Sequence, residues 1–206
     1  VARWVSELVA SGLAASTVRQ THRVLSLILA DAVKANRVAR NVAEGVALPR
    51  ISGTRRRYLT AEQVAVLADG ARGQDRLIVL LLAYTGLRFG ELAALKVGSV
   101  NLMRRRLEVV EAVSEVSGRL VHGTPKTHQQ RTVVVPRFIA DDLAAQVAGR
   151  RPDEPVFPAP GGGVLRLMNW RRRSFDPLVR AAGLEGLTPH ELRHTAASLA
   201  VASGAS

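Results

Sequence analysis

The sequence LTPHELRHT, at residues 187–195, organises the chain because it carries the local signals of a helix start. Thr188 is a good capping residue, Pro189 suits the first helical position, and Glu191 has the spacing of a capping box. Leu187 and Leu192 stand where a hydrophobic staple would lie. The stretch therefore predicts a helix that begins at residue 188 and fades at 203–204.

The first turn of this predicted helix carries two groups that suit an anion. His190 and Arg193 are three residues apart, so they share one helix face. Free N–H groups and the helix dipole already favour negative charge at a helix N-terminus. The pair therefore indicates one wall of a phosphate pocket. The structural alternatives are a surface histidine and a salt bridge from Arg193 to Glu191.

Composition points to a globular protein with a polyanionic partner. The 206 residues are 47% hydrophobic and carry a formal net charge of +12, which favours nucleic acid over an ordinary basic surface. Cysteine is absent, so disulfides, thiol catalysis and thiolate metal sites are excluded. The chain has neither a secretory signal order nor a long apolar run, which favours a cytoplasmic protein without a membrane span.

The first half of the chain reads as two helical regions separated by a linker. Residues 1–48 look helical, most clearly from Ser16 to Lys34, with Ser16 as the expected cap. Residues 49–58 form a basic linker with proline and glycine. A second capping box at Thr60 and Gln63 opens a helix to about residue 71. A buried helix over 75–85 is stopped by Gly86, and a short helix follows over 89–95.

The second half adds strands before it returns to helices. Residues 107–116, 119–121 and 132–135 are predicted to form a small three-stranded antiparallel sheet, with Lys126 near a turn. Helices are expected over 137–147 and over the arginine-rich 169–182, which Pro177 kinks or splits. The predicted fold class is mainly α with a small antiparallel β-sheet, α+β.

Four cationic or titratable residues stand at special places: Arg88 after the Gly86 stop, Lys126 in the turn region, and His190 with Arg193. Together they suggest phosphoryl chemistry without a metal or cofactor. Two guanidiniums can clamp non-bridging oxygens, a histidine can assist proton transfer, and a lysine can protonate a leaving group. The carboxylates do not cluster as a metal-dependent nuclease requires. Taken alone, Arg88 can simply pair with Glu91, and Lys126 can be an ordinary turn lysine.

These stretches resemble the conserved boxes of the tyrosine recombinases, the phage integrase family. TGLRFGEL at 85–92 is similar to the first box and HELRHT at 190–195 to the second. PKT at 125–127, with Arg131 and VVVP at 133–136, resembles the β-hairpin lysine region. The resemblance implies the C-terminal part of a helical core-binding (DNA-binding) domain over 1–48, a linker over 49–58, and a catalytic domain lacking its C-terminal end over 59–206.

The resemblance also implies an activity, site-specific recombination or integration of double-stranded DNA by an enzyme of a phage or other mobile element. A tyrosine attacks the scissile phosphate, a 5′-hydroxyl leaves, and neither metal nor cofactor is needed. By motif match, Arg88 and Arg193 clamp the phosphate, Lys126 is the general acid, His190 assists, and Glu91 orders Arg88. Such enzymes work as tetramers on DNA, here expected in the cytoplasm of a bacterium and at its nucleoid.

The nucleophile is the main departure from the family pattern. The family places its tyrosine downstream of the second box, whereas the only tyrosines in this sequence are Tyr58 and Tyr84. The chain is therefore expected to be truncated and to bind DNA without cleaving it. The alternatives are a non-catalytic remnant that acts as a regulator or competitor, and a basic scaffold without a phosphate pocket. The sequence does not specify the target DNA, the direction of recombination or accessory proteins.

Overall fold

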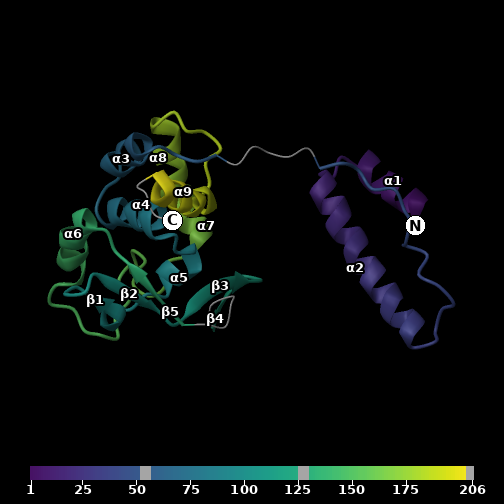
Figure 1. The fold of residues 1–206 in the computed structure, drawn as a ribbon, viewed down its shortest axis with the longest axis horizontal. Helices are drawn as coiled ribbons and strands as arrows, with labels where there is room; N and C mark the ends of the chain where they lie inside the picture. Colours follow the sequence, from purple (N-terminus) through teal and green to yellow (C-terminus); the bar gives the residue numbers. More distant parts are fainter. Residues whose placement is uncertain (52–56, 125–129, 203–206) are drawn as a thin grey trace. The chain divides into compact units, whose positions relative to one another are not determined.

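A computed structural model describes residues 1–51, 57–124 and 130–202 of the chain (Figure 1). The chain forms two compact units, Val1–Arg55 and Arg56–Ser206. The larger unit contains all the strands and all the candidate site residues that the structure describes.

The smaller unit is a pair of helices, α1 (Ala2–Ala10) and α2 (Ala15–Lys34), followed by an irregular segment. The segment is fastened to α2, since Asn41 Nδ2 donates to the Ser26 carbonyl at 3.0 Å and His22 Nε2 lies 3.0 Å from the Ala43 carbonyl oxygen. The helix expected to end at Lys34 is confirmed. The expected cap is wrong, because Ala14 occupies the N-cap position without a side-chain bond and Ser16 is the second residue of α2.

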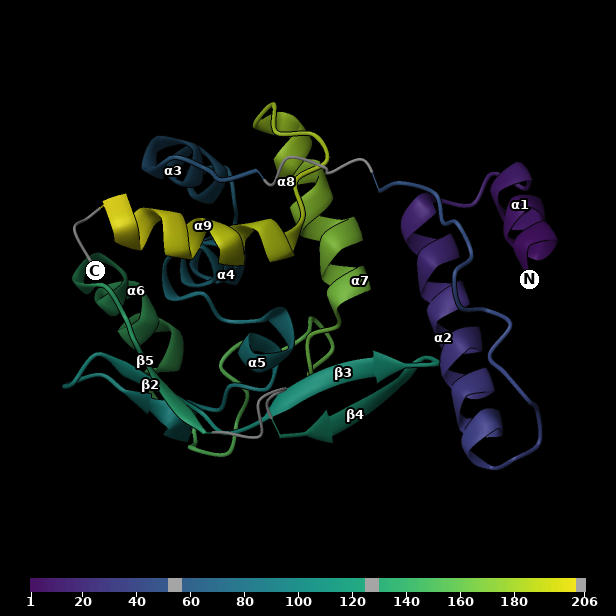
Figure 2. The ribbon, with the colours of Figure 1, turned by 45° about the vertical axis from the view of Figure 1, so that its right-hand side comes forward.

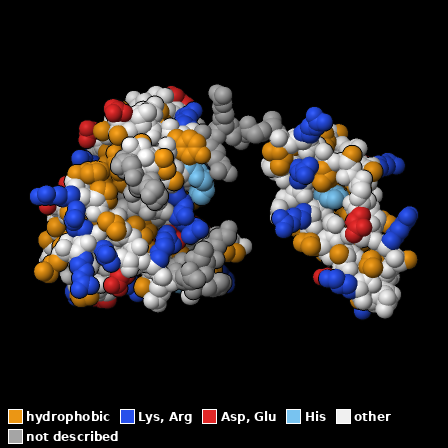
Figure 3. All heavy atoms as spheres, viewed as in Figure 1, with side chains coloured by type: hydrophobic (Ala, Val, Ile, Leu, Met, Phe, Trp, Pro, Cys, Tyr) orange, Lys and Arg blue, Asp and Glu red, His pale blue; other side chains and the backbone are white. Residues whose placement is uncertain are grey.

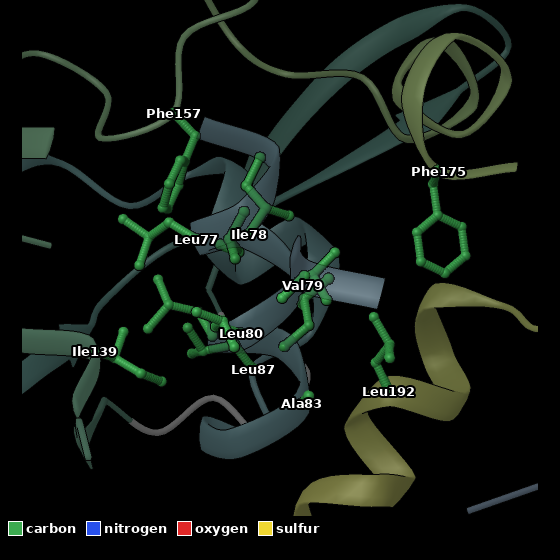
Figure 4. Close-up of a cluster of buried hydrophobic side chains, with 14 of the residues drawn as sticks. Leu77, Ile78, Val79, Leu80, Ala83, Leu87, Ile139, Phe157, Phe175 and Leu192 are labelled. Atoms are coloured by element: carbon green, nitrogen blue, oxygen red, sulfur yellow. The ribbon is translucent and has the colours of Figure 1, made fainter. Parts of the chain in front are cut away.

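The larger unit is built around α4 (Gln74–Thr85), which is apolar on nearly every side and buried from Leu77 to Ala83. Figure 4 shows its side chains facing Ile139, Phe157 and Leu192, which come from other elements. The helices packed on it are α3 (Ala61–Asp69), α5 (Phe89–Ala93), α6 (Arg137–Val147) and α9 (Pro189–Ala202). The predicted helices around α4 are therefore present, and they close one core.

Both predicted capping boxes are formed. Thr60 accepts from the Gln63 N–H at 3.3 Å while the Gln63 side chain accepts from the Thr60 N–H at 3.0 Å. At the start of α9, the Thr188 N–H donates to Glu191 Oε2 at 2.8 Å. The staple residues Leu187 and Leu192 are buried. These local patterns fix where two of the core helices begin.

The strands form two sheets, so the expected single three-stranded sheet is wrong (Figure 2). One sheet has the order β1-β2-β5, from β1 (Val100–Asn101), β2 (Arg106–Val109) and β5 (Arg131–Val134). The short 3₁₀ turn η1 (Val97–Ser99) directly precedes β1 in the chain. The other sheet is the hairpin of β3 (Ala112–Val116) and β4 (Arg119–Gly123).

The expected strand over 107–116 breaks because its two halves have different partners. Leu107 and Val109 are buried and pair with β5, whereas β3 pairs with β4. Ser117 and Gly118, which join β3 to β4, both have positive φ, 49° and 76°. That backbone twist favours a tight hairpin, which turns β3 away from β5.

The arginine-rich segment is helical from Leu167 to Ala181, with a π-helical turn just before Pro177. It consists of α7 (Leu167–Trp170), the π-helical turn η2 (Arg171–Phe175) and α8 (Asp176–Ala181). Pro177 lies in the first turn of α8, where a missing N–H costs little. Trp170 stacks on Phe175 with ring centroids 5.0 Å apart, which anchors the turn in the core. Across the described parts of the chain, no helix has the length and apolar character that crossing a membrane requires.

Candidate active site

The position of Arg88 is set by a sharp turn between α4 and α5. Gly86 ends α4 in the left-handed conformation, with φ 65°, which glycine adopts without strain. Leu87 is then fully buried and Arg88 caps α5. The Arg88 side chain, which is one-third exposed, therefore directly follows the buried Leu87 in the chain.

The first turns of α9 supply the other cationic groups. Arg193 donates to the Gly86 carbonyl, so α9 is tied to the same turn that positions Arg88. The predicted alternative for Arg193, a salt bridge to Glu191, is not formed, because Glu191 bonds Thr188 instead. His190 is exposed, and its ring meets that of His194 edge-on with centroids 4.5 Å apart.

These side chains line one pocket of about 380 Å³. Arg88, His190 and Arg193, which the sequence analysis grouped, are all in its lining, together with Arg171 of η2 and Thr188. Its apolar walls are Leu87, Phe89, Leu167 and Pro189. Figure 3 shows histidine and Lys or Arg side chains gathered side by side on one face of the larger unit. The fourth predicted residue, Lys126, lies outside the described residues.

Glu91 lies beneath the pocket with its side chain fully buried. Its carboxylate accepts from the Arg88 N–H at 2.8 Å and from Arg88 Nη1 at 2.9 Å. The structural alternative for Arg88, pairing with Glu91, is therefore observed, and it coexists with a place in the pocket lining. These bonds hold the backbone and one guanidinium nitrogen of Arg88 in place, and the catalytic part expected of Glu91 stays a prediction.

Arg131 is the site residue to which the sequence analysis gave no role. It opens β5 and holds Glu91 with two bonds, Nη1 to Oε1 at 2.8 Å and Nη2 to Oε2 at 2.6 Å. Its one sequence signal is that it follows the lysine stretch directly before a strand. No local pattern predicts that Arg131 bonds Glu91, because the two residues are 40 apart in the sequence.

Burial and neighbouring charges shift the pKa values of Glu91, Arg131 and Arg193. Burial alone raises the pKa of Glu91, but hydrogen bonds from Arg131 and Arg88 outweigh it and leave that pKa below its usual value. The bond to Glu91 raises the pKa of Arg131. Burial, then the nearby Arg88, lowers the pKa of Arg193.

His190 follows the same rules. Partial burial, His194, Arg193 and Arg88 together lower its pKa below 6.5. The imidazole is therefore neutral at pH 7 while the guanidiniums remain charged. Such a pocket attracts an oxyanion and offers it donors from three side chains. Within the described ranges, no group of three His, Cys, Asp or Glu side chains is placed to hold a metal ion.

This α+β domain therefore carries a cationic pocket that joins the turn after α4 to the start of α9. The sequence model of the phage integrase family matches residues 57–206, and the chain belongs to this family, the tyrosine recombinases.

The chain is also similar in sequence to proteins that are named tyrosine recombinases. Tyrosine recombinase XerC of Mycobacterium sp. (strain KMS) is 28% identical over 222 residues, covering 98% of this chain and 68% of the relative. Tyrosine recombinase XerA of Thermococcus kodakarensis is 31% identical over 171 residues, covering 76% of this chain and 52% of the relative.

Solved structures share the fold. The Tn1549 transposon integrase in complex with a circular intermediate DNA has a TM-score of 0.86 at 18% identity, covering 100% of this chain and 73% of that one. A lambda integrase dimer bound to a COC' core site has a TM-score of 0.65 at 18% identity, covering 97% and 71%. At these identities the likeness concerns the fold alone.

Proposed function

We propose that this chain is the DNA-binding and phosphate-clamping part of a site-specific DNA recombinase. The observation that carries the proposal is that Arg88, His190 and Arg193, which come from two distant boxes, line one pocket. Two fold neighbours are integrases in complex with DNA, and the net charge of +12 suits the same partner.

In the proposed reaction, Arg88 and Arg193 bind the non-bridging oxygens of the scissile phosphate and stabilise charge in the transition state. His190, neutral before DNA binds, donates a hydrogen bond to the same phosphate. A tyrosine oxygen forms a bond to phosphorus while the bond to the 5′-oxygen breaks, and Lys126 protonates that leaving oxygen. The reverse step joins a new strand, so the phosphodiester energy is kept.

We assign the proposed roles to the three segments that the sequence predicts. Residues 1–48 act as part of a core-binding domain, 49–58 as a basic linker and 59–206 as the catalytic domain. The whole protein acts as a tetramer on double-stranded DNA, in the cytoplasm and at the nucleoid.

We further propose that these 206 residues bind DNA without forming a covalent adduct. Tyr84 lies in α4 with its ring edge-on to Phe138, 4.9 Å between centroids, and it is not in the lining of the Arg88 pocket. Burial, with a contribution from Glu62, raises its pKa, which disfavours a phenolate nucleophile. Tyr58 is half exposed at the start of the larger unit, also outside that lining.

The position of both tyrosines also supports a second candidate, a DNA-binding regulator or competitor without catalysis. The reading frame that contains these residues discriminates the two. A tyrosine encoded downstream of residue 206 favours the recombinase, and an immediate stop codon favours the regulator.

The test of the clamp compares DNA binding by Arg88→Ala, Arg193→Ala and a matched control, Arg151→Ala. Arg151 is largely exposed and already paired with Asp153 and Glu154. By fluorescence anisotropy on a duplex selected from random sequences, we expect about tenfold weaker binding for each clamp variant and no weakening for the control. Clamp variants that bind like the control would refute the proposal.

The test of the missing nucleophile uses a nicked suicide substrate built on the selected duplex. Denaturing electrophoresis should show no protein–DNA adduct with the 206 residues. A stable adduct would show that Tyr58 or Tyr84 attacks the phosphate, contrary to the proposal.

A further inference from the structure

Glu91 is shared unequally by two arginines. Arg131 grips both carboxylate oxygens in a bidentate fork, at 2.8 Å and 2.6 Å, whereas the Arg88 guanidinium reaches only Oε1, at 2.9 Å. Bidentate charge-assisted pairs are the stronger kind and fix the geometry of both partners. The carboxylate is therefore held in place mainly by Arg131.

This unequal sharing leaves Arg88 with donors to spare. Arg88 Nη1 is bonded to Glu91, while within the described residues no protein acceptor binds its Nη2 or Nε. Arg88 also lines the pocket, and Arg131 does not. Because two guanidiniums face one carboxylate, the group keeps one net positive charge beside Arg193.

We propose that Arg131 is a positioning residue that acts through Glu91 to keep the positive charge of Arg88 uncompensated and its guanidinium available for a phosphate. This inference rests on the proposed phosphate clamp and deepens it. Without Arg131, Arg88 is the one cationic side chain among the described residues that bonds the buried carboxylate, so the negative charge of Glu91 offsets that of Arg88 and draws its guanidinium away from the pocket. Arg131 also opens β5, five residues after Lys126 in the sequence, so one carboxylate ties the Arg88 turn to the strand that follows the lysine stretch.

Charge counting distinguishes this role from simple structural support. The trio of Arg88, Glu91 and Arg131 carries +1. Arg131→Gln brings it to zero, whereas the double variant Glu91→Gln/Arg131→Gln restores +1 with two amides that can still bond each other. A purely structural role makes the double variant no better than Arg131→Gln, because it loses both ion pairs.

The experiment titrates inorganic phosphate at low ionic strength into the whole chain and follows arginine Nε–H signals by NMR. We expect Arg131→Gln to bind phosphate about tenfold more weakly than the wild type. The double variant and Arg131→Lys, which keeps the charge, should lie within about threefold of the wild type. Circular dichroism checks folding, and if Arg131→Gln unfolds, the double variant and Arg131→Lys still decide the question.

The phosphate titrations separate a failure of the Arg131 role from a failure of the phosphate clamp. If Arg88→Ala abolishes phosphate binding but Arg131→Gln binds like the wild type, the role of Arg131 is refuted while the clamp stands. A double variant as weak as Arg131→Gln or as Arg88→Ala also refutes it. If phosphate perturbs no Arg88 signal in the wild type, the clamp itself fails, and the inference fails with it.

Discussion

Burial, then His194, Arg193 and Arg88, lowers the pKa of His190. We expect its NMR titration to have a midpoint below 6.5, the ordinary value. Bound phosphate offsets the two guanidiniums, so added phosphate should raise that midpoint. A midpoint at or above 6.5 that does not respond to phosphate would separate His190 from the clamp.

The same shift links His190 to stability. Its pKa is lower in the folded than in the unfolded chain, so between the two values the unfolded chain binds more protons. Stability should therefore fall as the pH drops from about 6.5 through the folded pKa, and His190→Gln should reduce that fall. Urea unfolding at pH 7.5 and at pH 5.5 measures it. An equal loss of stability in both proteins would show that His190 does not cause the fall.

Gly90 allows α5 to approach β3. A Cβ built on it would lie 2.2 Å from the Val113 carbonyl oxygen, which belongs to the backbone and cannot move freely. We expect Gly90→Ala to lower the free energy of unfolding by roughly 1–3 kcal/mol, measured by urea denaturation. Gly123→Ala is the control, because the described residues, apart from the chain neighbours of Gly123, place no atom within 4 Å of its Cβ position. Equal effects in the two variants would rule out this close contact.

Among the elements, α9 matters most, since it carries both His190 and Arg193. Thr188→Ala removes the side chain that caps α9 and bonds Glu191. We expect a loss of about 1 kcal/mol in the free energy of unfolding, measured in urea. Thr188→Ser keeps the hydroxyl and should stay near the wild type. Equal losses in both variants would show that the cap bond does not stabilise α9.

Sequence patterns predicted the elements whose signals are local. Thr60 and Thr188 with their partners three residues on, and Gly86 as a helix stop, all act within one turn. The division of 107–116 into β2 and β3 was not predictable in the same way. It depends on which strand each half pairs with, and alternation of side chains alone does not reveal a partner.

For the candidate site, too, local patterns were predictable from the sequence and tertiary contacts were not. Arg88, His190 and Arg193 were predicted together, and the structure places them in one pocket. Arg131 was not assigned because its bond to Glu91 is a tertiary contact between residues 40 apart in the sequence. The π-helical turn that brings Arg171 into the pocket lining was equally invisible, since its sequence reads as an ordinary helix.

For the whole molecule, the charge of +12 makes DNA binding depend on salt. If Arg88 and Arg193 neutralise one phosphate, the double variant Arg88→Ala/Arg193→Ala should reduce the slope of log K against log salt by about one, not two. Anisotropy titrations at four salt concentrations give the slope. Arg151→Ala should leave the slope unchanged. A reduction of about two would place the arginines on separate phosphates.

If Arg88 and Arg193 form one phosphate site, a phosphate titration of the wild-type chain tests this most directly. The titration follows the NMR signals of the two arginine Nε–H groups. Both signals should shift with a single dissociation constant, and Arg88→Ala should remove the response of Arg193. Two unrelated dissociation constants, or an Arg193 response that survives Arg88→Ala, would contradict a shared site.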